Sequence, residues 1–231
     1  MKYPTLLLLA LALMACNAKT AKTNGAPPPT PETKEPPKEL SIAGAIAHKN
    51  GWENWGDVSE INFTFNVDRG ENHFERSWSW QPKTNNVALY TATDTVRYNQ
   101  KNMDSTALKT DAAFINDKYW LLAPFNLAWD ENATRSAATK QQAPISKDSL
   151  YKITITYGSE GGYTPGDAYD FFYDDGFTVK EWVFRKGNSN KPTMTTTWEE
   201  HNVYNGLKIS GMHRDSTGNF KLYFTDISVI K

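Results

Sequence analysis

Apolar and polar residues alternate along much of this chain, which is the pattern of half-buried β-strands. The clearest example is a run of four apolar residues, each separated from the next by one polar residue: Ile61, Phe63, Phe65 and Val67. A second strand is predicted at about 74–80, after a turn at 68–71, and shorter strands at 86–92 and 94–99. From residue 149 onward, alternating segments are separated by turn signals such as Thr164-Pro165-Gly166-Asp167. The pattern predicts ten or eleven strands in all.

The alternation stops in two places. Near the start, apolar residues recur at helical spacing after Ser41, which predicts a helix over 40–50 that ends near Asn50-Gly51. In the middle, residues 104–118 suit a second helix. The segment that follows, 119–129, is the most apolar after the N-terminal residues, and Pro124 is expected to break any single regular element there. We therefore expect a helical or irregular plug that lies against the sheet.

The N-terminus has the features of a bacterial lipoprotein signal. Lys2 precedes a short apolar run at 6–12, and Leu13-Met14-Ala15-Cys16 is similar to a lipobox. Residues 1–15 are predicted to be removed, which leaves Cys16 as the acylated N-terminus. The alternatives are an ordinary cleaved signal with an incidental Cys, and a single membrane anchor, for which the apolar run is short.

The segment after Cys16 differs from the rest of the chain. Residues 17–38 hold six prolines and no large apolar residue, so residues 16–38 are predicted to form a lipidated, extended tether. The folded domain is predicted to span 39–231. Asn17 occupies the position where an Asp retains lipoproteins at the inner membrane in the familiar sorting rule, so an outer-membrane location is favoured in the cell envelope, with the leaflet left open.

Charge and composition exclude several function classes. Without residues 1–15, 24 Lys and Arg face 26 Asp and Glu, so no basic excess favours nucleic acid. Cys16 is the only cysteine, which leaves no thiol for metal binding or nucleophilic catalysis once it is acylated. The four histidines are scattered, and carboxylates such as Asp170 and Asp174 are better explained by turns than by catalysis or Ca²⁺ binding. We expect no catalytic residue, no metal and no cofactor, and a monomer.

Several short motifs together carry a family resemblance. They are Ala47-His48-Lys49-Asn50-Gly51-Trp52, Tyr119-Trp120-Leu121-Leu122-Ala123-Pro124-Phe125, Thr164-Pro165-Gly166-Asp167 and Gly206-Leu207-Lys208-Ile209-Ser210. In this order they resemble a family of lipid-anchored bacterial proteins grouped with the LolA/LolB-like lipoprotein carriers and receptors. The resemblance implies a mainly β (α+β) fold in which a curved antiparallel sheet forms an unclosed β-barrel with an N-terminal helix and a plug. It also implies a hydrophobic cavity for an acyl chain or similar ligand.

Three functions stay open at this stage: a membrane-anchored protein that binds a lipid or other hydrophobic ligand, a structural or interaction module with a filled core, and an enzyme acting on glycans or lipids. For the first, the segment 119–129 is a lid over the cavity; for the second, it is permanent core. The aromatic content of 13% supplies most of the predicted cavity and lid residues. They are Phe63, Phe65, Trp78, Trp80, Trp120, Leu121, Leu122, Phe125, Tyr169, Phe171, Trp182 and Phe184.

Overall fold

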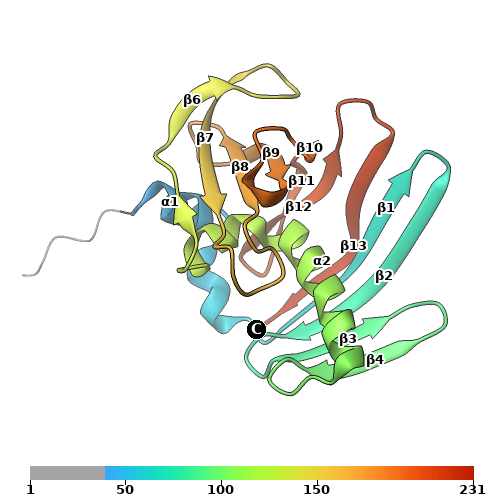
Figure 1. The fold of residues 1–231 in the computed structure, drawn as a ribbon. Coiled ribbons are helices and arrows are strands. Elements are labelled where there is room, and N and C mark those ends of the chain that lie inside the picture. The colour runs from blue at the N-terminus through green and yellow to red at the C-terminus, as the bar shows by residue number, and fades with distance from the viewer. Residues whose placement is uncertain (1–39) are drawn as a thin grey trace, which may run out of the picture. The chain divides into compact units, whose positions relative to one another are not determined.

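The computed structural model describes residues 40–231 (Figure 1). The predicted signal peptide at 1–15, the lipidation site Cys16 and the tether at 16–38 lie outside the described residues. The helices are α1 (Ile42–Lys49), η1 (Trp52–Asp57), α2 (Ser105–Trp129) and η2 (Lys186–Asn188). The first seven strands are β1 (Glu60–Arg69), β2 (Asn72–Gln81), β3 (Asn86–Tyr90), β4 (Thr95–Asn99), β5 (Thr134–Arg135), β6 (Thr139–Gln142) and β7 (Ser149–Thr156). The others are β8 (Ala168–Tyr173), β9 (Val179–Arg185), β10 (Met194–Thr197), β11 (Glu199–Tyr204), β12 (Leu207–Arg214) and β13 (Phe220–Ile230).

The strands form two antiparallel sheets that do not close into a barrel. One sheet has the order β11-β12-β13-β1-β2-β3-β4, and the other has the order β10-β9-β8-β7-β5, with β6 also paired to β7. Helix α2 runs across the inner side of both sheets (Figure 1). The predicted mainly β architecture with an open antiparallel sheet, an N-terminal helix and a helical plug is confirmed. The predicted number of strands was too low because the short, polar β5 and β6 carry no alternating apolar pattern.

The first and last strands of the domain lie side by side in the larger sheet. β1 pairs with β13 from Glu60 opposite Ile230 to Arg69 opposite Phe220. The register shifts between Asn62 and Thr64, opposite a bulge in β13. Strands that are far apart in sequence therefore meet at the centre of the sheet.

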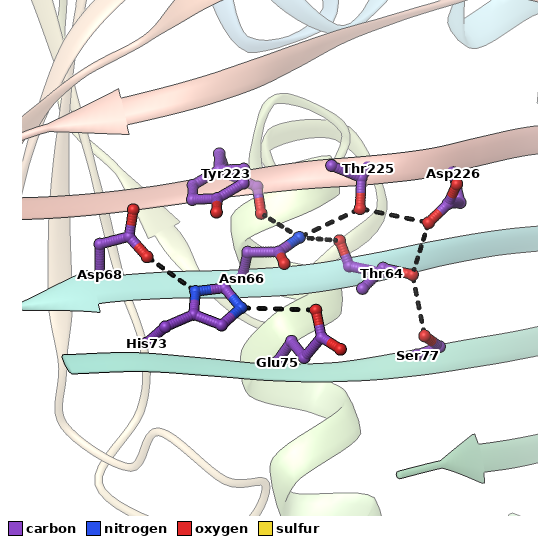
Figure 2. Close-up of polar contacts among 9 residues, drawn as sticks. All are labelled: Thr64, Asn66, Asp68, His73, Glu75, Ser77, Tyr223, Thr225 and Asp226. Atoms are coloured by element: carbon purple, nitrogen blue, oxygen red, sulfur yellow. Dashed lines mark hydrogen bonds and ion pairs between the residues drawn. The ribbon is translucent and has the colours of Figure 1, made fainter. Parts of the chain in front are cut away.

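The two faces of this sheet differ in chemistry, as the alternation predicted. Phe63 and Phe65 of β1 are buried on the side of α2. Figure 2 shows polar side chains on the other face, with α2 behind the strands. There the Asn66 amide donates to the Thr225 hydroxyl at 3.2 Å, and the Thr64 hydroxyl donates to Asp226 at 3.1 Å. Their mutual hydrogen bonds offset the cost of burying Thr64 and Asn66 in the middle of the sheet.

An exposed histidine lies at one end of this polar face (Figure 2). His73 Nδ1 is 2.8 Å from Asp68 Oδ1, and His73 Nε2 is 3.4 Å from Glu75 Oε2. The hydrogen bond to Asp68 raises the pKa of His73 above its ordinary value, and the hydrogen bond to Glu75 has a smaller effect in the same direction. Both ring nitrogens are engaged by carboxylates, so His73 is an ion-paired surface residue.

Helix α1 and η1 meet the β11–β12 hairpin through a close backbone contact. The Ser41 hydroxyl accepts a hydrogen bond from Gly44 N and caps α1, as predicted. Gly51 has a φ of 89°, and a Cβ there would lie 1.9 Å from the carbonyl oxygen of Gly206. Lys208 N donates to the Asn50 carbonyl at 2.9 Å. Only glycine fits at position 51, and the contact attaches the start of the domain to its last quarter.

Helix α2 is longer than the sequence suggested. It begins after Asp104, whose carboxylate accepts from Ala107 N at 2.8 Å, and it runs to Trp129. Pro124 lies inside the helix, and the backbone departs from helical geometry only at Leu122 (φ −126°, ψ 19°). Pro124 was expected to break any single regular element here, and the helix is interrupted in this segment by a kink at Leu122, although the chain remains helical on both sides. A proline removes one hydrogen bond and crowds the preceding turn, and here a kink absorbs that strain because both halves of the helix are packed.

A buried carboxylate fixes α2 to β2. Asp117 is 0% exposed. It accepts hydrogen bonds from Arg76 Nε at 2.6 Å and Arg76 Nη2 at 2.7 Å, and from Trp78 Nε1 at 2.8 Å. The bidentate pair sets the position of the helix along the strand.

Candidate ligand-binding cavity

A large cavity lies between α2, the inner faces of the sheets and the loop that joins β7 to β8. Its volume is about 1300 Å³. It is lined by β1, β2 and β13 on one side, by β8, β9 and β10 on the other, by α2 and the residues after it, and by residues 157–164 of the loop. Several of the lining loop residues are exposed, so the cavity opens to solvent on that side. Its size exceeds that of most small-molecule pockets.

The wall on the side of the smaller sheet is a run of stacked aromatic rings. The ring centre of Tyr169 lies 4.5 Å from that of Tyr119, 5.2 Å from that of Trp182 and 5.0 Å from that of Phe184. Because alternate residues of β8 and β9 share a face, Tyr169, Trp182 and Phe184 all point inward. The wall presents a continuous apolar surface with few hydrogen-bonding groups.

The predicted cavity residues divide into two groups. Those that line the cavity are Phe65, Trp120, Tyr169, Trp182 and Phe184. Those that belong to the hydrophobic core without lining the cavity are Phe63, Trp78, Trp80, Leu121, Leu122, Phe125 and Phe171. The second group lies on the inner side as expected, but its members fill the space between α2, η1 and the sheets. The alternation of apolar residues identified the inner face of the sheets. It could not show which part of that face lines the cavity and which part is covered by the core.

The segment 119–129 is packed largely as core in this structure, and its role as a lid stays a prediction. Residues 119–127 are all buried, because this half of α2 packs between the sheets and against η1. Only part of it, including Tyr119, Trp120, Asn126 and Trp129, reaches the cavity. The segment is core that also forms one wall.

The covering element is the loop between β7 and β8, which sequence reasoning read only as a hairpin connection. Figure 1 shows it passing over α2, and the Tyr163 hydroxyl donates to Asp111 Oδ2 of α2 at 2.8 Å. Burial of the hydroxyl, together with Asp111, raises the pKa of Tyr163 to about 12. Gly161 and Gly162 have φ values of 76° and 66°, so the loop follows a path that favours glycine.

A group of hydrogen-bonding residues lies at the C-terminal end of α2. Asn126 Nδ2 donates to Asp130 Oδ2 at 2.7 Å, and the Tyr157 hydroxyl donates to the same oxygen. The hydroxyls of Tyr119 and Tyr157 are 3.2 Å apart and share a hydrogen bond. Burial raises the pKa of both tyrosines, so both are neutral hydroxyls at ordinary pH. None of these four residues was among the predicted cavity residues, although Tyr119 and Asn126 lie in the predicted lid, and a lone Asn inside an apolar run was a usable signal.

A buried histidine lies behind Trp120. His213 Nδ1 is 3.2 Å from the Thr197 carbonyl and donates to it, and its ring lies 4.5 Å from Trp198 and 5.3 Å from Trp120. Burial lowers the pKa of His213 to about 3. The imidazole is therefore neutral and packs as an aromatic residue.

The carboxylates considered from sequence have structural partners. Asp170 forms an ion pair with Arg185 at 3.0 Å, and Asp174 accepts from Gly176 N and Thr178 N, as its turn position predicted. Over residues 40–231, no three His, Cys, Asp or Glu side chains are grouped so that they could hold a metal ion. None of the helices in that part of the chain has the length and apolar character needed to cross a membrane.

No family model and no curated protein matches the chain. Among solved structures, a LolA superfamily protein from Nitrosomonas europaea has 10% identity and a TM-score of 0.49, over 83% of this chain and 95% of that one. A DUF1329 family protein from Desulfovibrio piger has 8% identity and a TM-score of 0.44, over 82% and 94%. An outer membrane lipoprotein-sorting protein domain from Vibrio parahaemolyticus has 7% identity and a TM-score of 0.40, over 81% and 90%. At such low identities and TM-scores, these likenesses carry no conclusion about ligand or activity.

Proposed function

We propose that this protein binds a lipid or another hydrophobic ligand in the cavity, and that acylated Cys16 holds it at a membrane of the cell envelope. The observation that carries the proposal is a cavity of about 1300 Å³ beside a stacked aromatic wall. We propose that the protein acts by binding, as a monomer, without catalysis or a cofactor.

The physical argument rests on the apolar character of the walls. Besides the aromatic wall, Phe65 and Val67 of β1 and Leu222 of β13 face the cavity. An apolar ligand that displaces water from such a surface gains about 25 cal/mol for each Å² that it removes from water. Polar groups gather at the C-terminal end of α2, and others line the cavity near the β1–β2 turn, so the apolar wall lies between polar groups. An amphiphile would place its apolar chain along the wall and its polar head group beside the polar residues.

A titration with a fatty acid or phospholipid should change tryptophan fluorescence saturably, because Trp120, Trp129 and Trp182 line the cavity. Ala112→Phe should weaken binding about tenfold or more, since Ala112 is an exposed α2 residue at the cavity and a phenyl ring there occupies ligand space. Stability should change little, because the site is open to solvent.

The matched control is Thr106→Phe, which adds the same ring at an exposed α2 position that does not line the cavity. It should leave the titration unchanged. An absence of any saturable signal in the unmodified protein, or equal effects of the two variants, would contradict the proposal.

The alternative is a non-catalytic structural or interaction module. The continuous burial of residues 119–127 favours it, because this segment behaves as core. A protein with that role should show no ligand titration, and native mass spectrometry of purified protein should find no copurifying lipid.

Replacing Cys16 with alanine should move the protein from the membrane fraction to the soluble fraction, because the lipid attachment site is lost. The unfolding transition of the domain should stay where it was, since the predicted tether separates Cys16 from the domain. Fractionation followed by immunoblotting, with thermal unfolding alongside, measures both. Retention of the Cys16→Ala protein in the membrane fraction would argue for an uncleaved anchor.

A further inference from the structure

We propose that the ligand of this cavity carries a protonated amine, whose ammonium group binds between Asn126 and Asp130 at the C-terminal end of α2. This inference rests on the proposed function, because it names the class of hydrophobic ligand that the same cavity takes. The inference comes from hydrogen-bond acceptors in the cavity lining that no donor or cation of the described residues satisfies.

The first observation is the side-chain carbonyl of Asn126. Asn126 is 5% exposed and lines the cavity, and its Oδ1 has no hydrogen-bond partner within the described part of the chain. Its Nδ2 donates to the Asp130 carboxylate at 2.7 Å, which fixes the amide orientation, since the reverse orientation would place two acceptors together. A buried acceptor without a donor is unfavourable. A ligand with an N–H group removes that cost.

The second observation is the state of Asp130 itself. Its carboxylate accepts from Asn126 and from the Tyr157 hydroxyl, and it forms no ion pair with any residue of 40–231. Tyr119 and Tyr157 use their hydroxyls within this group. These neutral donors are therefore used up, and the Asn126 carbonyl still has no donor. The Asp130 carboxylate acts on the Lys118 ammonium through space, but no cation forms an ion pair with it within the described residues. An ammonium group supplies both the charge and the donors.

The charge of the lining points the same way. Besides Asp130, three carboxylates line the cavity, those of Glu131, Glu160 and Asp167. Within residues 40–231 none of the three forms an ion pair. A surface with excess negative charge attracts cations and repels a carboxylate or phosphate head group.

The two long cationic side chains that line the cavity, those of Lys118 and Arg69, lie over aromatic rings. The Lys118 ammonium lies 5.4 Å from the ring centres of both Trp80 and Trp129. Burial lowers the pKa of Lys118, and the charge of Asp130 opposes this shift. The Arg69 guanidinium lies 5.4 Å from the ring centre of Phe220. Each cation is held over an aromatic face, and neither is within ion-pair distance of Asp130.

Two other cations near the cavity also have partners of their own. His73 is engaged by Asp68 and Glu75 on the far face of the sheet. Arg135 donates to main-chain carbonyls at the end of α2, those of Leu127 at 2.8 Å and Asp130 at 2.7 Å. The guanidinium of Arg135 therefore caps the helix, and the Asp130 carboxylate is left to the cavity.

The aromatic wall adds a further attraction for a cation. Tyr119 and Tyr157 lie near Asp130, and they contact Tyr169 and each other at ring-centre distances of 4.5–6.2 Å. Tyrosine and tryptophan faces attract ammonium groups, most strongly where water is excluded.

The test compares dodecylamine, dodecanol and dodecanoate on the full-length protein at neutral pH, below their aggregation concentrations, by tryptophan fluorescence. The alkyl chain is the same in all three, so differences report on the head group. We expect dodecylamine to bind about tenfold or more tightly than dodecanoate, with dodecanol between them. Equal affinities, or tighter binding of dodecanoate, would overturn the inference and leave the proposed function standing. No binding of any of the three would defeat both.

Asp130→Asn locates the head group. It keeps an acceptor for the Tyr157 hydroxyl while it removes the charge, and it should lower dodecylamine affinity about tenfold with little change for dodecanol. Glu160→Gln is the matched control, since it removes one cavity carboxylate from an exposed loop position, and it should have a much smaller effect. Equal effects of the two variants would mean that the total charge of the cavity, and no specific site, sets the preference.

Discussion

Replacing Trp120 with alanine should lower the free energy of unfolding by about 3–5 kcal/mol, because the truncation leaves a cavity in the core beside the existing one. The Trp120 side chain is 8% exposed, and its ring centre lies 4.4 Å from that of Trp182 and 5.3 Å from that of His213. Chemical denaturation followed by circular dichroism measures the change without relying on the tryptophan that is removed.

Leu108→Ala on the same helix is the control, since Leu108 is 49% exposed. It should change the free energy of unfolding by about 0.5 kcal/mol or less. If Trp120→Ala weakened ligand binding while costing less than about 1 kcal/mol, the segment 119–129 would be a mobile lid after all, and the present packing would be one of two states.

Replacing Asp117 with alanine should destabilise the domain by a similar amount, about 3–5 kcal/mol, for an electrostatic reason. The change leaves the Arg76 guanidinium, which is mostly buried, without its carboxylate, and it leaves Trp78 Nε1 without an acceptor. The cost comes from the unpaired groups that remain and not from the small volume that is lost. Thermal and denaturant unfolding measure it directly.

The double variant Arg76→Met, Asp117→Leu separates these two causes. Replacing both charges with apolar side chains of similar size should recover much of the lost stability, because no buried charge is then left unpaired. If the double variant were as unstable as Asp117→Ala, the contribution of Asp117 would lie in positioning α2 through Trp78 rather than in neutralising Arg76.

Local patterns along the chain were enough to predict most of the secondary structure. Phe63 and Phe65 face inward because strand periodicity leaves few other ways to bury them, and Ser41 caps α1 as its position before the apolar run indicated. The continuity of α2 could not be predicted. Whether Pro124 ends a helix or only kinks it depends on tertiary packing on both sides of the kink.

An apolar cavity on the inner face could be predicted from the sequence, but the residues that line it could not. Seven of the twelve predicted residues fill the core because the depth of packing depends on where α2 lies, and that position is set by contacts such as Asp117 with Arg76. The hydrogen-bonding group at the C-terminal end of α2 was missed for a related reason. Asn126, Asp130 and Tyr157 come from two separate segments, and only the fold brings them within hydrogen-bonding distance.

The pairing of β1 with β13 and the contact of Gly51 with Gly206 determine when the domain can be completed. As the chain is synthesised from its N-terminus, β1 has its hairpin partner β2 early, but its other edge stays unpaired until β13 has been added. The corner formed by α1 and η1 packs on α2, but its backbone contact with Gly206 cannot form until the β11–β12 hairpin exists. A chain with such non-local closing contacts folds slowly compared with a helical bundle of equal length, and it exposes an unpaired strand edge to other chains in the meantime. The unpaired edge of β1 is therefore the strand edge that stays open to other chains until β13 pairs with it.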